Sequence, residues 1–288
     1  MYAITGVSGH TGSVVAETLL AQGKPVRVVV RDAQKGEPWR KKGAEVAIAS
    51  VDDAAGMTRA LTGVEGAYLL LPPVVTSPAP LEHNANVARA LAAAVKAAGV
   101  PHVVLLSSIG AQHADGTGPI RALHVAEREL AATGAALTAV RAAYFQENLG
   151  ASLATLASGT VYTFLPKDLR FPQVATRDIG RTAAAALVEG APRGTTRVIE
   201  LAGPREVGGA DAEAVLRKLT GKPIEVATAP LDAVVPTFTG FGVSPQVAAL
   251  YREMYEGIIS GRVGWAGGAA RAVRGSTDLE ETVRKLLA

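Results

Sequence analysis

Three glycines spaced three residues apart are the first residues in this sequence that could do chemistry. The stretch AITGVSGHTG, residues 3–12, places them directly behind a short apolar run. A strand, such a glycine turn and a helix in succession form the context of a phosphate-binding loop, in which phosphates rest on the helix N-terminus. We therefore predict that this loop holds a nucleotide through Gly6, Ser8, Gly9, His10, Thr11 and Gly12. A glycine turn without a ligand is the alternative.

The end of the second predicted strand, within VVVRDAQK, indicates which nucleotide the loop would hold. In such folds an acidic residue at this place bonds the ribose 2′-hydroxyl of NAD, whereas an arginine accommodates the 2′-phosphate of NADP. Arg31 stands there, and a planar guanidinium pairs bidentately with a phosphate. Lys35 follows one turn later as a less direct helper. The sequence therefore predicts NADP(H) as cofactor, with an exposed loop arginine as the alternative.

The chain around these residues alternates apolar runs with helical stretches, which predicts βαβ units and a parallel sheet. Six strands are expected over the first half, at residues 2–5, 26–30, 44–49, 66–71, 102–108 and 136–141. Helices are expected between them over 13–23, 53–61, 80–98 and 119–133. The fold class is therefore α/β, a Rossmann-type doubly wound parallel sheet that occupies residues 1–150.

Beyond residue 141 the alternation loosens, which indicates a second, smaller unit. A helix over 176–190 and a strand over 196–203 are expected to rejoin the sheet. Further helices are expected over 210–220, 231–239, 244–260 and 278–288, with a strand near 224–228. We assign residues 151–175 and 204–288 to a smaller C-terminal α/β lobe on the substrate side, with the sheet rejoined by 176–203.

Six segments together resemble the NmrA-like family of atypical short-chain dehydrogenases/reductases. They are ITGVSGHTG, VVVRD, LLLPP, LLSSIGA, VRAAYFQENL and ATRDIGRTAAAAL, in the order and spacing of that family. The family includes NADPH-dependent quinone oxidoreductases and NADP-sensing regulators. The resemblance implies that Leu71 and Pro72 line the path beneath the ribose and that Ser107 and Ser108 lie near the nicotinamide. It also implies a substrate side formed by Tyr144, as a catalytic residue, with Phe145, Glu147 and Asn148.

The helix after the fifth strand lacks the proton-donating pair of standard short-chain reductases, Tyr-x-x-x-Lys. In that pair the lysine lowers the tyrosine pKa so that the phenol can protonate a carbonyl oxygen. None of the six tyrosines has a lysine four residues on, and Ile120 and His124 stand where the pair would be. Because an imidazole can pass a proton near pH 7, we predict that His124 is catalytic, oriented by Glu127 and Arg128 one turn on. A packing role is the alternative.

The composition excludes several classes of site and partner. Cysteine is absent, so disulfides, thiolate metal sites and cysteine nucleophiles are excluded. The five histidines show no metal-ligand spacing, and we expect no metal. The few aromatic residues and the net charge of only +3 argue against nucleic-acid binding. The lack of long apolar runs argues against membrane insertion. With no signal peptide expected, we predict a cytoplasmic protein; a monomer and a homodimer both stay open.

Two functions fit these patterns. The first is an NADPH-dependent oxidoreductase that passes hydride to a quinone, an enal or another conjugated carbonyl, because the anion formed from such an acceptor is stable enough to take its proton from water. The apolar stretch 236–243, with Tyr251 and Tyr255, would then wall the pocket, or would be lobe core. The second is a non-catalytic NADP(H) sensor that binds a regulatory protein, which the missing Tyr-x-x-x-Lys pair favours.

Overall fold

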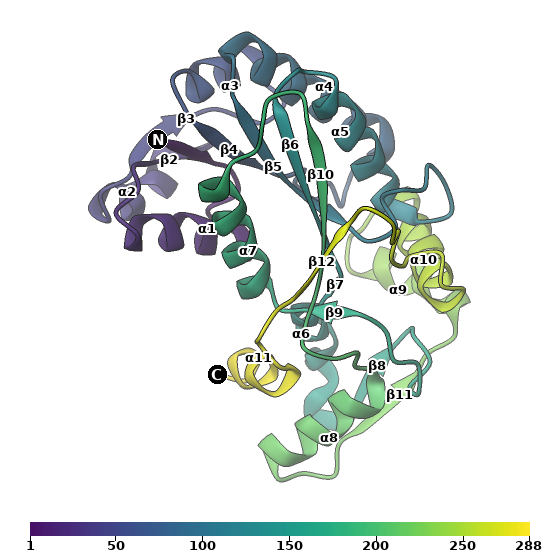
Figure 1. The fold of residues 1–288 in the computed structure, drawn as a ribbon. Helices are drawn as coiled ribbons and strands as arrows, with labels where there is room; N and C mark the ends of the chain where they lie inside the picture. Colours follow the sequence, from purple (N-terminus) through teal and green to yellow (C-terminus); the bar gives the residue numbers. More distant parts are fainter.

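An eight-stranded sheet forms the centre of the molecule in the computed structural model, which describes all 288 residues (Figure 1). Every neighbouring pair of its strands is parallel. The strand order is β12-β10-β6-β5-β4-β1-β2-β3. The strands are β1 (Tyr2–Ile4), β2 (Val26–Val30), β3 (Glu45–Ile48), β4 (Gly66–Leu69), β5 (His102–Ser108), β6 (Ala136–Ala142), β10 (Thr196–Ala202) and β12 (Arg271–Arg274).

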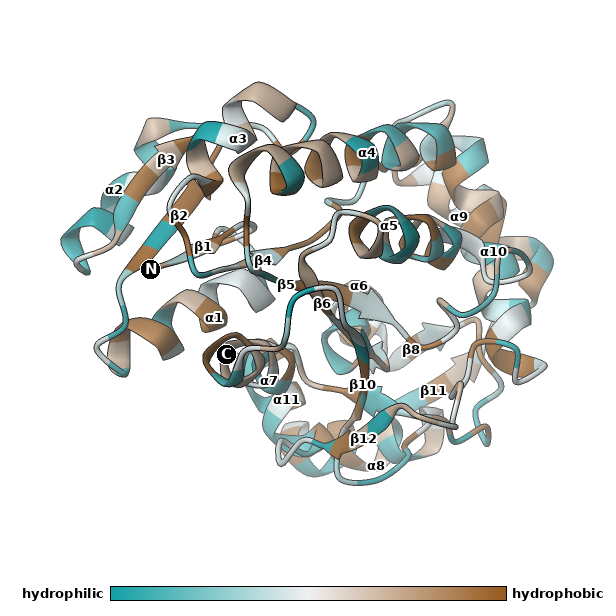
Figure 2. Ribbon diagram, turned by 45° about the horizontal axis from the view of Figure 1, so that its top comes forward, coloured by the Kyte–Doolittle hydropathy of each residue, from teal (hydrophilic) through white to brown (hydrophobic).

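Helices cover both faces of this sheet, and each face has its own apolar core. One face carries α1 (His10–Ala21), α2 (Ala33–Lys41) and α7 (Thr176–Glu189). The opposite face carries α3 (Ala54–Leu61), α4 (Pro80–Ala98) and α5 (Arg121–Ala131). Figure 2 colours this ribbon by hydropathy. Because helices cover both faces of the central strands, β5 and β6 are nearly continuous apolar runs in the sequence. The predicted doubly wound parallel sheet is confirmed.

The strand order reverses between β1 and β4, which are adjacent in the sheet although β2 and β3 separate them in the chain. In open parallel sheets the crevice outside the carboxyl ends of the strands at such a switch point binds the ligand. The loops that follow β1 and β4 border this crevice. The fold therefore directs the search for the site to the glycine loop, which follows β1, and to the carboxyl ends of the strands beside it.

A smaller lobe lies beyond the carboxyl ends of the strands (Figure 1). It contains two small parallel sheets, in which β8 (Thr160–Thr163) pairs with β11 (Glu225–Thr228) and β7 (Tyr144–Phe145) with β9 (Gln173–Val174). Its helices are α6 (Leu149–Ser152), α8 (Gly209–Thr220), α9 (Val234–Gly240), α10 (Pro245–Ile259) and α11 (Leu279–Leu286). A third apolar core joins α8 and α11 to the sheet of β8 and β11.

The structure differs from the sequence expectations mainly after residue 150. Residues 271–274, which we assigned to the lobe, form β12 and pair with β10 at the edge of the main sheet. Strands β8 and β9 and helix α2 were not expected; Asp32 accepts a hydrogen bond from the Gln34 amide and so caps α2. No helix has both the length and the apolarity that a membrane crossing requires.

Candidate active site

The glycine loop between β1 and α1 has the geometry of a phosphate cradle. Gly6 has φ +66°, a left-handed conformation that glycine adopts without strain. A Cβ on Gly12 would lie 2.5 Å from the carbonyl oxygens of Thr5 and Gly6, so only glycine fits where the loop meets the helix. No side chain caps α1 and its first turn holds no acidic residue, which leaves the N-terminal amides for an anion. These residues fit a dinucleotide pyrophosphate.

Arg31 lies at the carboxyl end of β2, exposed and without an ion-pair partner, as the 2′-phosphate of NADP(H) requires. Lys35 is also exposed, on the first turn of α2. The Arg31 guanidinium and His83 both help to lower the pKa of Asp52, although the hydrogen bond from Ser50 is the largest cause. Asp52 therefore lies near enough to Arg31 to feel its charge, beside the place where the adenine end of a cofactor would rest.

The predicted contacts at the ends of β4 and β5 differ in how far their side chains are engaged by the protein itself. Leu71 and Pro72 follow β4 and are half-buried at the switch point. The Ser108 hydroxyl donates to the Ile109 carbonyl at 2.9 Å. The Ser107 side chain is buried and its hydroxyl donates to Oε1 of Glu127 at 2.5 Å. The proton of the Ser107 hydroxyl is therefore committed to Glu127, and the predicted contact of Ser107 with a nicotinamide stays a prediction.

His124 lies half-buried on α5, and one of its two ring nitrogens is hydrogen-bonded while the other is free. Its Nδ1 is 2.9 Å from the carbonyl oxygen of Ala111, in the loop after β5. Because a carbonyl only accepts, Nδ1 carries the proton and Nε2 is left as the acceptor of the neutral ring. No protein group bonds Nε2. The ring is therefore oriented by the backbone, and a proton can enter or leave at Nε2.

Glu127 does not orient His124, so that part of the prediction is wrong. Its carboxylate binds Arg141 of β6 in a two-pronged ion pair, with Nε–Oε1 at 2.9 Å and Nη2–Oε2 at 2.6 Å. Hydrogen bonding to Glu127 raises the pKa of Arg141 above that of a free arginine. Arg128 is exposed and makes no such contact. The pair holds α5 against β6, an arrangement that sequence spacing alone did not indicate.

Tyr144 is packed into the lobe. Burial raises the pKa of its hydroxyl, and hydrogen bonds from Tyr255 and Asn148 offset part of that rise. Its ring meets that of Phe171 edge to face at 5.5 Å between centroids. A tyrosine with a raised pKa stays protonated near neutral pH and is a weaker proton donor than the activated tyrosine of standard short-chain reductases.

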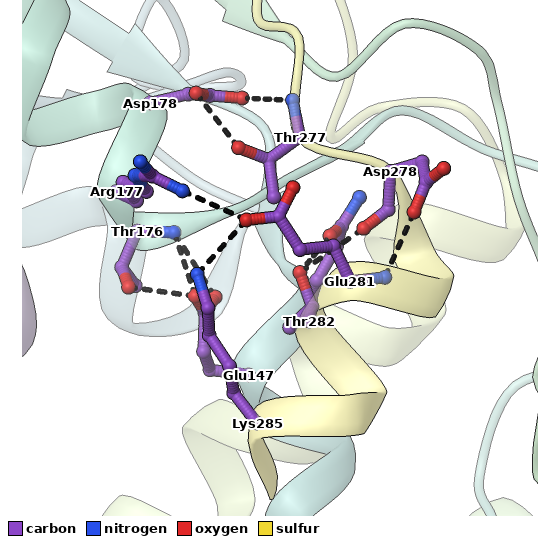
Figure 3. Close-up of polar contacts among 10 residues, drawn as sticks. Glu147, Thr176, Arg177, Asp178, Thr277, Asp278, Glu281, Thr282 and Lys285 are labelled. Atoms are coloured by element: carbon purple, nitrogen blue, oxygen red, sulfur yellow. Dashed lines mark hydrogen bonds and ion pairs between the residues drawn. The ribbon is translucent and has the colours of Figure 1, made fainter. Parts of the chain in front are cut away.

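Glu147 has a structural partner. Its carboxylate accepts from the Thr176 amide at 2.9 and 3.1 Å and from the Thr176 hydroxyl at 2.7 Å, so that it caps α7 from outside the helix (Figure 3). Glu147 thus has a capping role that the sequence did not indicate, and its contact with a substrate stays a prediction. Phe145 and Asn148, half-buried and exposed respectively, stay predicted contacts.

An aromatic cluster lies next to Tyr144. The rings of Phe238 and Tyr251 are 5.0 Å apart, those of Phe164 and Tyr255 5.6 Å, and those of Phe164 and Phe238 6.0 Å. Tyr251 and Tyr255 were expected either to wall a pocket or to form lobe core, whereas Phe164 fell in an expected loop. The only signal in the sequence that could have indicated a role for Phe164 is its aromatic side chain, within the stretch FLP. No group of three or more acidic or histidine side chains is placed to hold a metal.

A family model described as the NmrA-like family matches residues 2–280. The chain belongs to the NmrA-like family. The NAD(P)H azoreductase of Xenophilus azovorans is 27% identical over 256 residues, which cover 88% of this chain and 86% of that protein. Quinone oxidoreductase 2 of Escherichia coli strain K12 is 30% identical over 229 residues, which cover 78% of this chain and 76% of that protein.

The likeness extends to solved structures. An NADPH-dependent quinone oxidoreductase from Escherichia coli, crystallised in complex with NADPH, superposes with a TM-score of 0.78 at 25% identity, covering 100% of both chains. The agreement over whole chains includes the C-terminal lobe, which lies beyond the six segments that carry the sequence resemblance. The lobe is therefore part of the common NmrA-like architecture.

Proposed function

We propose that this chain is an NADPH-dependent reductase that transfers hydride to a conjugated acceptor, a quinone, an enal or another conjugated carbonyl. The chain is an NAD(P)H-dependent oxidoreductase, as its azoreductase and quinone oxidoreductase relatives are, and NADP(H) is its cofactor. Azo and quinone groups, which those relatives are named for, are both conjugated acceptors.

The chain's own residues would hold the cofactor at three places. The uncapped N-terminus of α1 and the glycine cradle receive the pyrophosphate, and Arg31 receives the 2′-phosphate. Leu71 and Pro72 direct the ribose toward the end of β5. When bound, NADPH supplies the hydride, and the protein contributes orientation and the exclusion of water.

The absence of a strong proton donor is the observation that favours a conjugated acceptor over an ordinary ketone. Ile120, at the position of the usual tyrosine, is buried, and Tyr144 has a raised pKa. An ordinary ketone needs a strong acid beside its oxygen as hydride arrives. A quinone or enal spreads the new charge over a conjugated system, so that the proton can be delivered afterwards by water, or by the His124 ring once Nε2 has taken up a proton from water. The aromatic cluster around Tyr255 supports a flat, unsaturated substrate.

A sensor is the second candidate, and the same missing acid favours it. A protein that binds NADPH and NADP⁺ without turning over a substrate has no need of a proton donor. The half-buried His124 with its free Nε2 favours the reductase, because a ring used only for packing gains nothing from an open nitrogen.

Steady-state reduction of a small panel separates the two candidates. The purified protein would be mixed with NADPH and, in turn, a benzoquinone, a conjugated enal and a simple saturated ketone, while the reduced-nicotinamide absorbance is followed. We expect turnover of the quinone or the enal above the protein-free rate, and none of the ketone. Tight binding of both NADPH and NADP⁺ with no turnover of any acceptor would instead establish the sensor.

A further inference from the structure

Tyr68 is hydrogen-bonded to both ends of the glycine loop. It lies on β4, which pairs with β1, and its side chain is fully buried. Its carbonyl oxygen accepts from the Thr5 amide at 3.1 Å and from the Thr5 hydroxyl at 3.0 Å, where the loop begins. Its phenol donates to the Thr11 hydroxyl at 2.9 Å, in the first turn of α1. One residue therefore brackets the loop that is predicted to hold the pyrophosphate.

The bond between the Tyr68 phenol and the Thr11 hydroxyl is shielded from water. The two residues are 0% and 6% exposed and stand 57 positions apart in the chain. Burial raises the pKa of Tyr68, so the phenol stays neutral and keeps its proton. No other side-chain hydrogen bond joins residues 6–12 to another strand or helix. The bond is therefore the one directional link between the loop and the sheet on the helix side.

Two glycines bring the same turn of α1 close to its neighbours by shape alone. A Cβ on Gly12 would lie 2.5 Å from the Thr5 carbonyl oxygen. A Cβ on Gly180, in α7, would lie 2.9 Å from the Thr11 carbonyl oxygen and 2.5 Å from Cβ of Val14. Such contacts limit how near α1 lies to β1 and α7, but they have little directional preference. The direction in which the first-turn amides point then depends on the hydrogen bond to Tyr68.

We propose that Tyr68 is a positioning residue for the cofactor pyrophosphate. Its phenol holds the first turn of α1, through Thr11, in the orientation in which the helix amides meet the phosphates. Because Tyr68 is fully buried, it acts through Thr11 and not by contact with the cofactor. The proposal rests on the proposed cofactor site, to which it adds a residue outside the glycine loop. Without this bond the cofactor would have to order the loop as it binds, which lowers affinity.

A role at the pyrophosphate has a different signature from a role at the 2′-phosphate. NADPH and NADH share the pyrophosphate, whereas only NADPH carries the 2′-phosphate that Arg31 is predicted to bind. Loss of the Tyr68 phenol should therefore weaken both cofactors by the same factor. Loss of Arg31 should weaken NADPH alone.

Tyr68→Phe keeps the ring and removes the hydroxyl, and fluorescence titration measures the affinity for each cofactor. We expect both affinities to fall about 5-fold, because one buried hydrogen bond is lost. The KM for NADPH with a quinone should rise while kcat changes little. Hydrogen–deuterium exchange of residues 5–12 should be faster in the cofactor-free variant, a readout that requires neither binding nor turnover.

A double-mutant cycle tests whether the two hydroxyls act together. Thr11→Val should weaken both cofactors by a similar factor. The double variant Tyr68→Phe/Thr11→Val should lose no more than either single variant, because both partners of the bond are then apolar. Losses that add independently would overturn the proposal.

Tyr2→Phe provides the matched control, since Tyr2 is a buried tyrosine of the adjacent strand β1 without a hydrogen bond to the loop. It should leave both affinities and the exchange of residues 5–12 unchanged. Wild-type affinities in Tyr68→Phe would overturn the proposal, and so would a loss confined to NADPH. If the wild-type protein binds neither cofactor, the proposed function fails as well. Binding without turnover of any acceptor would contradict the reductase alone, since the titrations need no turnover.

Discussion

A histidine lies at each end of strands β5 and β6, His102 in β5 itself and His124 on the neighbouring helix α5, and the surroundings of the two differ. At the amino end, His102 is 3% exposed; its Nε2 lies 2.8 Å from the Thr138 hydroxyl, which also accepts from Arg197 at 2.7 Å. At the carboxyl end, His124 is half-buried and its Nε2 is free. Burial, with the Arg197 charge as a smaller cause, lowers the pKa of His102 to about 4. The same residue type is therefore a neutral structural group at one end and the predicted proton carrier at the other.

The comparison extends to the ion pairs around the two rings. At the amino end, Arg197 pairs with Glu189, which is half exposed. At the carboxyl end, Arg141 and Glu127 have side chains only 10% and 13% exposed, and Ser107 adds a third hydrogen bond to the same carboxylate. The more deeply buried pair thus lies beneath the helix that carries His124. The end of the sheet that is predicted to do chemistry is therefore also the end with the more deeply buried ion pair.

The largest effect is expected from breaking this buried pair. Glu127→Ala leaves the Arg141 guanidinium buried without a partner, and we expect the free energy of unfolding to fall by about 3–5 kcal/mol. Urea unfolding followed by circular dichroism measures the loss. Glu189→Ala, which opens the exposed pair at the other end, should cost about 1 kcal/mol or less. Equal losses for the two variants would contradict the difference drawn between the two ends.

The second prediction concerns the pH dependence of stability at the amino end. The folded-state pKa of His102 is about 4, below the unfolded value of about 6.5, so the unfolded chain binds the proton first as the pH falls. The contribution of His102 is complete above pH 6.5 and is lost between pH 6.5 and 4, by about 3 kcal/mol in total. Urea unfolding at a series of pH values measures it.

His102→Leu removes the titrating group and tests the assignment. The variant should lose clearly less stability than the wild type between pH 6.5 and 4, whatever its stability at neutral pH. If the wild-type slope persists in His102→Leu, another group is responsible and the structural role of His102 is wrong.

The comparison also shows what the sequence could and could not predict. Helix α4 and strand β5 have the expected bounds, because their apolar periodicity and the Pro80 and Gly99 at the helix ends are local signals. The prediction for Arg31 is local too, since it depends on one position after one strand. Strand β12 was missed because it has four residues, mostly exposed, and pairs with a strand about 70 positions earlier.

The partners of side chains were the least predictable part of the site. Glu127 was assigned to His124 because the two lie one turn apart on a helix, but the strand beneath offers Arg141 with better geometry. Glu147 was expected to face the substrate, and it caps a helix that begins 29 residues later. In both cases the residue type indicated that the side chain would have a polar partner. Which partner it has depends on how elements that are distant in the chain pack together.

The third prediction concerns Arg31, which lies at the carboxyl end of β2 where the cofactor is predicted to bind. Arg31→Ala should weaken NADPH binding about 50-fold, because a charged and bidentate contact to the 2′-phosphate is lost, and should change NADH binding little. Fluorescence titration with each cofactor measures both affinities. Arg59→Ala, an exposed arginine on α3, serves as the control and should change neither. A similar loss for NADPH and NADH would place the 2′-phosphate elsewhere.

The smallest effect, and the sharpest test of the free nitrogen, is expected at His124. His124→Gln keeps a donor for the Ala111 carbonyl but cannot titrate, so it retains the contact and removes the proton transfer. We expect kcat with a quinone to fall about 10-fold, less than for an obligatory acid because water replaces the ring, and its dependence on pH between 5 and 8 to flatten. His124→Ala should behave alike in both respects. If Gln restores the wild-type rate and pH profile while Ala does not, His124 serves only to hold the loop after β5, and the two ends of the strands differ in burial but not in purpose.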